Sequence, residues 1–393
     1  METFDEIIAP LPRDQFFADF WNKRFLASKG TRGRFTDLLS WNDLNRILEE
    51  HRLSPPRLRL THEGRAIEPY RYMSPGAGGN PQLNAGKLAA CLSAGATLVL
   101  DCVEELAPRV RMLAASFRET LHAANYVNLY AGWHSQNGLD LHWDSQEIMV
   151  LQLVGRKRWQ IFEPTRINPL PDDNEAPARP TGLPIWDGML EDGDMLYIPR
   201  GWWHVAFPVG EPSLHLTIAT TPPHGMDLLQ WLIGRMRCHE AVRADLPRLD
   251  DAKGQRAYLK ALRPLLAEAL SDEAIAQFRH EWEGDLRPLQ TMRLPEMPYV
   301  QIEALTETRL IRLAAAHHLH FERSGENMEF KANGVVWGGL PPHLVPALEM
   351  LSDTQAVSFA DMCARLDGDA AKAHLRQTLA ALARAGVVAV EGS

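Results

Sequence analysis

Six short runs of β-forming residues, separated by turns, fill the middle of the chain and limit the folds that it can adopt. The runs are Tyr126–Tyr130, Glu147–Leu153, Arg158–Phe162, Met195–Ile198, Val205–Phe207 and Leu214–Thr220. Each is rich in residues that favour strands, and turn-forming residues lie between them. Many short strands at close spacing are typical of a sandwich or a barrel. We therefore expect a mainly β core inside a mixed α/β chain.

A His-Trp-Asp tripeptide at positions 142–144 lies among these runs, in an apolar and strand-like neighbourhood, Leu139–Ser145. Residues i and i+2 of a strand point to the same face, so we expect His142 and Asp144 to point the same way. One imidazole and one carboxylate are two thirds of the 2-His-1-carboxylate set that binds non-haem Fe(II) and leaves positions open on the metal. The rest of the chain should then supply a third ligand.

Two histidines later in the β-rich region are candidates for that ligand. His204 ends the segment Gly193–His204, in which an apolar strand and a Pro-Arg-Gly corner precede it. Antiparallel pairing would return His204 to the mouth of the barrel, so we choose it as the third ligand. His215 also points inward on its strand, and we expect it beside the ligands or in the pocket. The alternative is that a barrel histidine is only a hydrogen-bonded core residue.

Lys157 follows a turn at Gly155 and begins the next run of β-forming residues. In this register its side chain points into the barrel, where it could pair with an anionic co-substrate, and the side chains of Arg156 and Arg158 point outward. Taken alone, Lys157 is as well explained by a solvated surface charge. Its position between the His-x-Asp and the later Pro-x-Gly-x-x-His favours the functional interpretation.

Together these motifs resemble those of the JmjC-type cupin oxygenases, and especially the ribosomal oxygenase branch. The resemblance is carried by His142-Trp-Asp144, Gly155–Trp159, Gly193–His204 and Leu214–Ile218, with Ser135-Gln-Asn-Gly138 leading into the first of them. It is close across residues 126–220 and looser over most of the remaining chain. It implies a double-stranded β-helix, the cupin/JmjC jelly roll.

The resemblance also implies a set of ligands and contacts. Fe(II) would be held by His142, Asp144 and His204, with 2-oxoglutarate and O₂ taking the open positions. Lys157 corresponds to the basic residue that pairs with the distal carboxylate of 2-oxoglutarate in that family. Further co-substrate contacts are implied for Asn128, Tyr130 and Thr217.

The expected reaction is hydroxylation of a protein side chain, with a ribosomal protein as one candidate substrate. The sequence departs from the family pattern at the extra Asn137, at the Leu-Asp-Leu before His142, and at Trp143, all near the expected substrate mouth. Four tryptophans could form an aromatic mouth suited to a peptide, or could simply pack at the rim: Trp133, Trp143, Trp202 and Trp203. Alternatives are the same chemistry on a tRNA base, a peptide natural product or a small metabolite, or a metal-binding cupin without catalysis.

The rest of the chain suggests a domain plan. We expect a catalytic domain with an N-terminal helical extension over residues 1–222, a helical connector over 223–298, and a winged-helix-like domain over 299–393. The resemblance implies that the connector forms a homodimer. Three cations on the last helix, Lys372, Arg376 and Arg384, are too few to predict nucleic-acid binding.

The composition of the chain indicates which partners and which cellular location to expect. The chain has 41 Lys and Arg against 50 Asp and Glu, a net charge of −9, which argues weakly against a broad nucleic-acid surface. Its four cysteines form no Cys-x-x-Cys pair. The acidic N-terminus does not resemble a signal peptide, and no apolar run approaches the ~18 residues of a membrane span. We expect a soluble, cytoplasmic protein.

Overall fold

The computed structural model describes residues 3–171, 173, 178–285, 305–314, 319–332, 335–353 and 356–391. The chain divides into two compact units, Met1–Pro222 and Pro223–Ser393, and each is described by itself.

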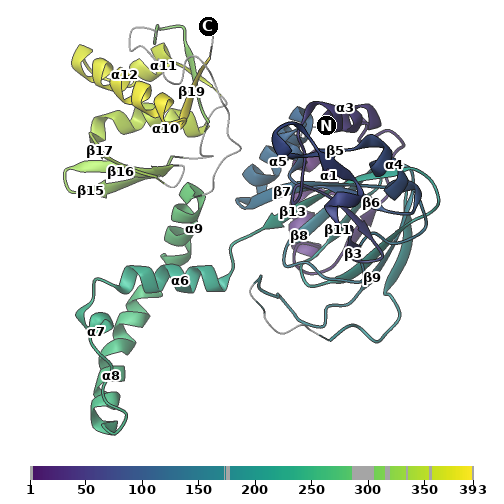
Figure 1. Ribbon diagram of the computed structural model, residues 1–393. Coiled ribbons are helices and arrows are strands. Elements are labelled where there is room, and N and C mark those ends of the chain that lie inside the picture. The colour runs from purple at the N-terminus through teal and green to yellow at the C-terminus, as the bar shows by residue number, and fades with distance from the viewer. Residues whose placement is uncertain are drawn as a thin grey trace. The chain divides into compact units, whose positions relative to one another are not determined.

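The first unit is built on two antiparallel sheets, which form the β-rich body in Figure 1. In spatial order, the strands of the large sheet are β1 (Leu26–Ser28), β11 (Met195–Ile198), β8 (Glu147–Val154), β13 (Ser213–Thr221), β7 (Ala124–Gly132), β6 (Thr97–Leu100), β2 (Leu58–His62) and β3 (Arg65–Ala66). Those of the small sheet are β10 (Trp186–Leu190), β9 (Lys157–Phe162) and β12 (Trp203–Pro208). Each run of β-forming residues found in the sequence lies in one of these strands.

A shared apolar core joins the two sheets. Ile148 and Val150 of β8 pack in one cluster with Trp159 and Ile161 of β9, and all four are buried. Alternate residues of each strand therefore face between the sheets, which is the arrangement of a jelly roll. The expected mainly β core of a mixed α/β chain is confirmed.

The N-terminal extension covers the large sheet with helices and short turns. The helices are α1 (Phe4–Ile8), α2 (Arg13–Asp19), α3 (Trp41–Glu50), α4 (Ala85–Ser93) and α5 (Pro108–Leu121), with 3-10 turns at Pro69–Arg71, Ala77–Gly79 and Val103–Glu105 and a hairpin of β4 (Met73–Pro75) and β5 (Pro81–Leu83). Phe16 of α2 packs on β11, where its ring lies 5.0 Å from that of Tyr197. Ser40 caps α3, since its hydroxyl accepts a hydrogen bond from the Asp43 backbone N–H at 3.2 Å.

Strands of this extension complete the large sheet beyond β7. Strand β6 pairs with β7 on one side and with β2 on the other. Strand β2 pairs with β6 over its first four residues, whereas the two-residue β3 pairs only with Thr61 and His62.

The second unit begins with helices and ends in a compact α/β module. The helices are α6 (Gly225–Met236), α7 (Glu240–Arg243), α8 (Ala252–Ala269) and α9 (Ala274–Asp285). The module contains one sheet of β18 (Val357–Ser358), β14 (Leu310–Leu313) and β19 (Val388–Glu391), a second sheet of β15 (Phe321–Ser324), β16 (Asn327–Ala332) and β17 (Val335–Leu340), a 3-10 turn at Pro342–Leu344, and the helices α10 (Val345–Asp353), α11 (Phe359–Cys363) and α12 (Asp369–Arg384). Among the described residues, no helix is long and apolar enough to cross a membrane.

The last helix, α12, packs one face into the module. Leu375, Leu379 and Leu382 of α12 are buried in the core of the module, and Gly386 turns the chain toward β19 with a φ of +71°. The sheet β15–β16–β17 was not anticipated. The winged-helix-like character of the module stays a prediction.

Candidate active site

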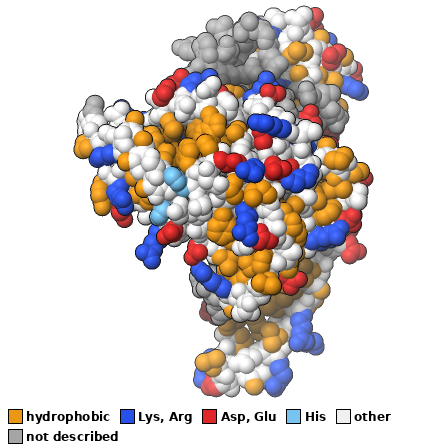
Figure 2. Space-filling view, turned by 90° about the vertical axis from the view of Figure 1, so that its right-hand side faces the viewer, with side chains coloured by type: hydrophobic (Ala, Val, Ile, Leu, Met, Phe, Trp, Pro, Cys, Tyr) orange, Lys and Arg blue, Asp and Glu red, His pale blue; other side chains and the backbone are white. Residues whose placement is uncertain are grey.

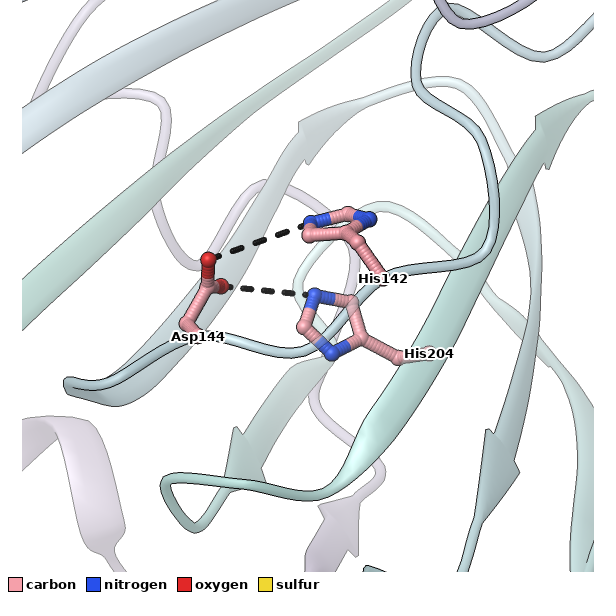
Figure 3. Close-up of side chains that lie close together, drawn as sticks. All are labelled: His142, Asp144 and His204. Carbon is pink, nitrogen blue, oxygen red and sulfur yellow. Dashed lines mark ion pairs between the residues drawn. The ribbon is translucent and has the colours of Figure 1, made fainter. Parts of the chain in front are cut away.

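Three side chains meet at one end of the jelly roll, as Figure 3 shows. His204 is the second residue of β12, and His142 and Asp144 lie in the connection between β7 and β8. The expectation that residues 139–145 form a strand is wrong, because only His142 pairs, as an isolated bridge to His204. The bridge consists of two backbone hydrogen bonds between these residues, of 2.8 and 3.2 Å.

A further backbone bond fixes the carboxylate end of this loop. The N–H of Gly201, in the corner before β12, donates to the backbone oxygen of Asp144 at 2.8 Å. The loop is therefore attached to β12 at both His142 and Asp144. Hydrogen bonds across the barrel, and not strand alternation, make the two side chains point to the same place.

The ligand atoms of these residues form a compact set. Nε2 of His142 lies 3.9 Å from Asp144 Oδ1, and Nε2 of His204 lies 3.5 Å from Asp144 Oδ2. One ligand atom from each residue can be chosen so that all three lie within 4.8 Å of one another. Two imidazoles and one carboxylate at this separation are the donors of a facial triad for Fe(II).

Both imidazoles are held in the tautomer that a metal requires. Nδ1 of His142 donates to the backbone oxygen of Asp140 at 2.7 Å, and Nδ1 of His204 donates to that of Trp202 at 3.0 Å. Because the proton stays on Nδ1, the lone pair of each Nε2 faces the gap between the three residues. Burial, together with the neighbouring His142, lowers the pKa of His204 to about 4, so its ring is neutral at neutral pH.

The triad opens into a cavity between the two sheets. Its lining residues are Thr97, Tyr130, Gly138, Leu139, His142, Asp144, Ile148, Lys157, Trp159, His204, Ala206, His215 and Thr217. No sequence motif points to Thr97, Leu139, Ile148 or Ala206 as pocket residues. Their apolar or small side chains carry no chemical pattern that would mark them in advance.

Lys157 brings a buried cation to this cavity. It is the first residue of β9 and is only 6% exposed. Burial lowers its pKa from 10.5 to about 7, and no described residue forms a hydrogen bond or an ion pair with it. Its neighbours in sequence point outward as the alternation predicts: Arg156 pairs with Glu211 at 3.0 Å and Arg158 pairs with Asp187.

Two ring nitrogens on the cavity wall also lack partners. Nε1 of Trp159 and Nδ1 of His215 are buried, and no described residue forms a hydrogen bond with either atom. The His215 ring stacks on Tyr130, with centroids 4.9 Å apart and planes 4° apart, and contacts the Trp159 ring edge to face. An ammonium group and two unsatisfied ring nitrogens among the residues that line one cavity favour an anion with several acceptor atoms.

The three weaker co-substrate candidates lie on neighbouring strands. Thr217 of β13 is opposite Asn128 of β7, and His215 is opposite Tyr130. Tyr130 and Thr217 line the cavity, whereas Asn128 accepts a hydrogen bond from the Cys102 backbone N–H at 3.3 Å and bonds with Tyr130. Asn128 is thus placed to orient Tyr130. Direct contact of these residues with a co-substrate stays a prediction.

Three of the four tryptophans expected at the mouth contact other side chains instead. Trp133 packs against Trp41, with ring centroids 5.5 Å apart, and Trp202 packs against Phe25 at 6.0 Å. Trp203 is 5% exposed, and its indole N–H donates to Thr165 Oγ1 at 2.9 Å. None of these tryptophans lines the cavity. These three tryptophans are therefore packing residues and do not form a mouth to the cavity.

The site lies within a stretch of the chain that matches a known protein family. Residues 105–228 match the family described as the JmjC domain. Ribosomal oxygenase 1 of Rattus norvegicus is 31% identical over 228 residues, which cover 55% of this chain and 36% of the rat protein. Ribosomal oxygenase 1 of Homo sapiens is 28% identical over 326 residues, covering 74% and 49%.

A third relative is the bifunctional lysine-specific demethylase and histidyl-hydroxylase NO66 of Drosophila persimilis, 28% identical over 231 residues, with 55% of this chain and 31% of that protein covered. The chain spans less than half the length of each of these three relatives.

Solved structures extend the likeness to the whole chain. YcfD, a ribosomal oxygenase from Escherichia coli solved in complex with cobalt and 2-oxoglutarate, aligns with a TM-score of 0.62 and 20% identity. The alignment covers 98% of this chain and 99% of YcfD. At this identity the likeness shows the fold, which is that of a JmjC cupin.

Proposed function

We propose that this chain, which has the JmjC cupin fold, is an Fe(II)- and 2-oxoglutarate-dependent oxygenase that hydroxylates a protein side chain. The observation that carries the proposal is the His142–Asp144–His204 set facing a cavity that also holds the buried Lys157, which forms no ion pair with any described residue. A metal-binding cupin without catalysis would have no use for a buried cation beside its metal.

The residues of the site fit this pair of cofactors. His142, Asp144 and His204 would hold Fe(II), because their donor atoms converge and both imidazoles present a free Nε2. The chemistry that iron supplies when bound is the O₂-dependent decarboxylation of 2-oxoglutarate to succinate and CO₂, coupled to hydroxylation of the substrate.

The chain itself contributes binding and shielding. Lys157 would pair with the distal carboxylate of 2-oxoglutarate, and the ring nitrogens of Trp159 and His215 would give that carboxylate further hydrogen-bond partners. Tyr130 and Thr217 would complete the polar wall. The apolar walls at Leu139 and Ile148 would exclude water from the reacting atoms.

The substrate class rests on the relatives. Two of them are named ribosomal oxygenase and a third histidyl-hydroxylase, so a side chain of a ribosomal protein is the first candidate. A cytoplasmic location would bring the enzyme to such a substrate. On the face in view in Figure 2, Lys and Arg side chains are interspersed with acidic and hydrophobic ones, which suits a protein partner better than a nucleic acid.

Mass spectrometry of host ribosomal proteins tests the substrate class. Proteins from cells that lack the enzyme should gain one oxygen atom on a defined peptide when they are incubated with the purified chain, Fe(II), 2-oxoglutarate and O₂. The Asp144→Ala variant should leave that peptide unmodified. If no ribosomal peptide gains oxygen while the enzyme decarboxylates 2-oxoglutarate, the substrate assignment is wrong.

We also propose that the chain forms a homodimer through the connector, residues 223–298, which precedes a winged-helix-like domain over 299–393. The 18-residue helix α8 has no buried residue, although it carries apolar side chains such as Leu259 and Leu266. Helix α6 exposes Leu229 and Ile233 on one face, and orange apolar side chains are visible on the helical part at the bottom of Figure 2. A second copy of the same helices would cover these faces.

A further inference from the structure

A cluster of two histidines and a glutamate lies in the unit Pro223–Ser393. His280 and Glu283 are three residues apart on α9, so their side chains share one face of the helix. His320 directly precedes β15 and reaches the same place. The ring centroids of His280 and His320 are 3.6 Å apart, and His320 Nε2 lies 3.4 Å from Glu283 Oε2.

The elements that carry this cluster are packed tightly. A Cβ added to Gly284 of α9 would lie 2.9 Å from Cβ of Lys331 on β16, so only glycine allows the helix to approach the sheet this closely. Beside the contact, a cavity is lined by both histidines and by Glu322 and Glu329. The cluster therefore has a fixed frame and room for an ion.

One atom of the cluster lacks a partner. Nε2 of His280 is buried, and no described residue forms a hydrogen bond with it. A buried ring nitrogen without a described partner, beside a second imidazole and a carboxylate, is placed to bind a cation.

The surrounding charges also favour a cation. Carboxylates of Glu281, Glu322 and Glu329 line the cavity together with the cations Arg235 and Lys331. Arg235 is paired with Glu281 at 2.9 Å. If that pair is counted as neutral, the carboxylates of Glu283, Glu322 and Glu329 remain around the cluster. The cation among the lining residues that remains is Lys331.

We propose that His280, Glu283 and His320 form a binding site for a divalent transition metal of the Zn²⁺ class. Imidazole and carboxylate donors select such ions over Mg²⁺ or Ca²⁺, which prefer oxygen ligands alone. The ion would join α9 to the sheet β15–β16–β17 as a structural cross-link. This site is independent of the proposed oxygenase activity, because it uses none of the residues that line the jelly-roll cavity.

Metal analysis of the full chain tests the site with Zn²⁺ alone as the probe. The His142→Ala/Asp144→Ala protein removes the first site, so its remaining metal content reports on the second. After chelation, incubation with Zn²⁺ and desalting, the wild type should retain about two ions per chain and the double variant about one. Adding His280→Gln or Glu283→Gln to the double variant should reduce that last ion by tenfold or more.

A spectroscopic measurement and a matched control variant distinguish loss of the metal site from misfolding. In the His142→Ala/Asp144→Ala background, Co²⁺ should give visible absorption bands that disappear with His320→Gln, while circular dichroism is retained. Glu326→Gln, at the exposed turn between β15 and β16, should leave metal content and bands unchanged. A double variant that retains no Zn²⁺, or Zn²⁺ retained equally after both His280→Gln and Glu283→Gln, would overturn the proposal.

Discussion

Replacing Lys157 with Met should change co-substrate binding and protein stability in opposite directions. Methionine nearly conserves the volume of the lysine stem but removes the only Lys or Arg among the residues that line the cavity. Loss of one partner from a buried, hydrogen-bonded charge pair costs about 2–4 kcal/mol, so the Kd for 2-oxoglutarate should rise by about 30- to 800-fold. Iron binding should persist, because Lys157 is not a ligand.

The same substitution should stabilise the protein when no co-substrate is bound. Burial lowers the pKa of Lys157 from 10.5 to about 7, which corresponds to about 5 kcal/mol of unfavourable free energy at pH below 7. This penalty is complete below pH 7, shrinks as the pH rises from 7 to 10.5, and is absent above 10.5, because the unfolded chain keeps its proton throughout that range. The gain from Lys157→Met should therefore be larger at pH 6 than at pH 9.

The affinity of the protein for 2-oxoglutarate should also depend on pH. A carboxylate pairs with the protonated ammonium group, so the affinity of the wild type for 2-oxoglutarate should be highest below pH 7. Above pH 7 it should fall by up to about tenfold for each pH unit, since binding must then recover a proton. Calorimetric titration with the metal held constant measures this dependence, and the slope should be absent in Lys157→Met.

Arg156→Met is the matched control, because Arg156 is an exposed neighbour whose pair with Glu211 lies at the surface. It should alter stability by less than about 1 kcal/mol and leave co-substrate affinity unchanged. Lys157→Met protein that binds 2-oxoglutarate as tightly as the wild type, or that is less stable at pH 6, would refute the assignment of Lys157 as a buried and unpaired cation.

Three further predictions concern the scaffold. Gly155→Ala should lower the free energy of unfolding by about 2–4 kcal/mol in a denaturant titration, because residue 155 has a φ of +71° and its Cβ would lie 2.2 Å from the Pro212 backbone oxygen; unchanged stability would contradict the turn geometry. Ser40→Ala should cost about 1 kcal/mol by the same measurement through loss of the α3 cap, and Ser40→Asp should restore most of it. Ile233→Lys should convert the proposed dimer to a monomer in sedimentation velocity, and a dimer that persists would exclude the α6 face as the interface.

The strands of the jelly roll could be predicted where their own residues carry the pattern. Lys157, Trp159 and Ile161 alternate with outward residues along β9, so the sequence alone predicts that one face of this strand is buried. Strand β10 carried no such signal, because Gly188 interrupts it and it exists through its pairing with β9. The sheet β15–β17 was missed for a related reason, since its short strands are stabilised by their neighbours and by the α9 contact.

The candidate ligands could be named from the sequence, but not the way in which the fold brings them together. His142 was assigned to a strand, whereas it lies in a loop that hydrogen-bonds to His204, a residue far along the chain. The two ring nitrogens of Trp159 and His215 illustrate a second limit. Whether a buried polar atom has a partner depends on packing from several strands, and no local pattern encodes it.

The central claim is that His142, Asp144 and His204 hold the iron that drives 2-oxoglutarate turnover. The most direct measurement is Fe(II)-dependent formation of succinate from 2-oxoglutarate by the full chain in the presence of a protein substrate. Wild type and Asp140→Asn, which alters an exposed carboxylate beside the same loop, should form succinate, and His142→Ala and Asp144→Ala should form none above the protein-free rate. Turnover that persists in the His142→Ala/Asp144→Ala protein would contradict the claim.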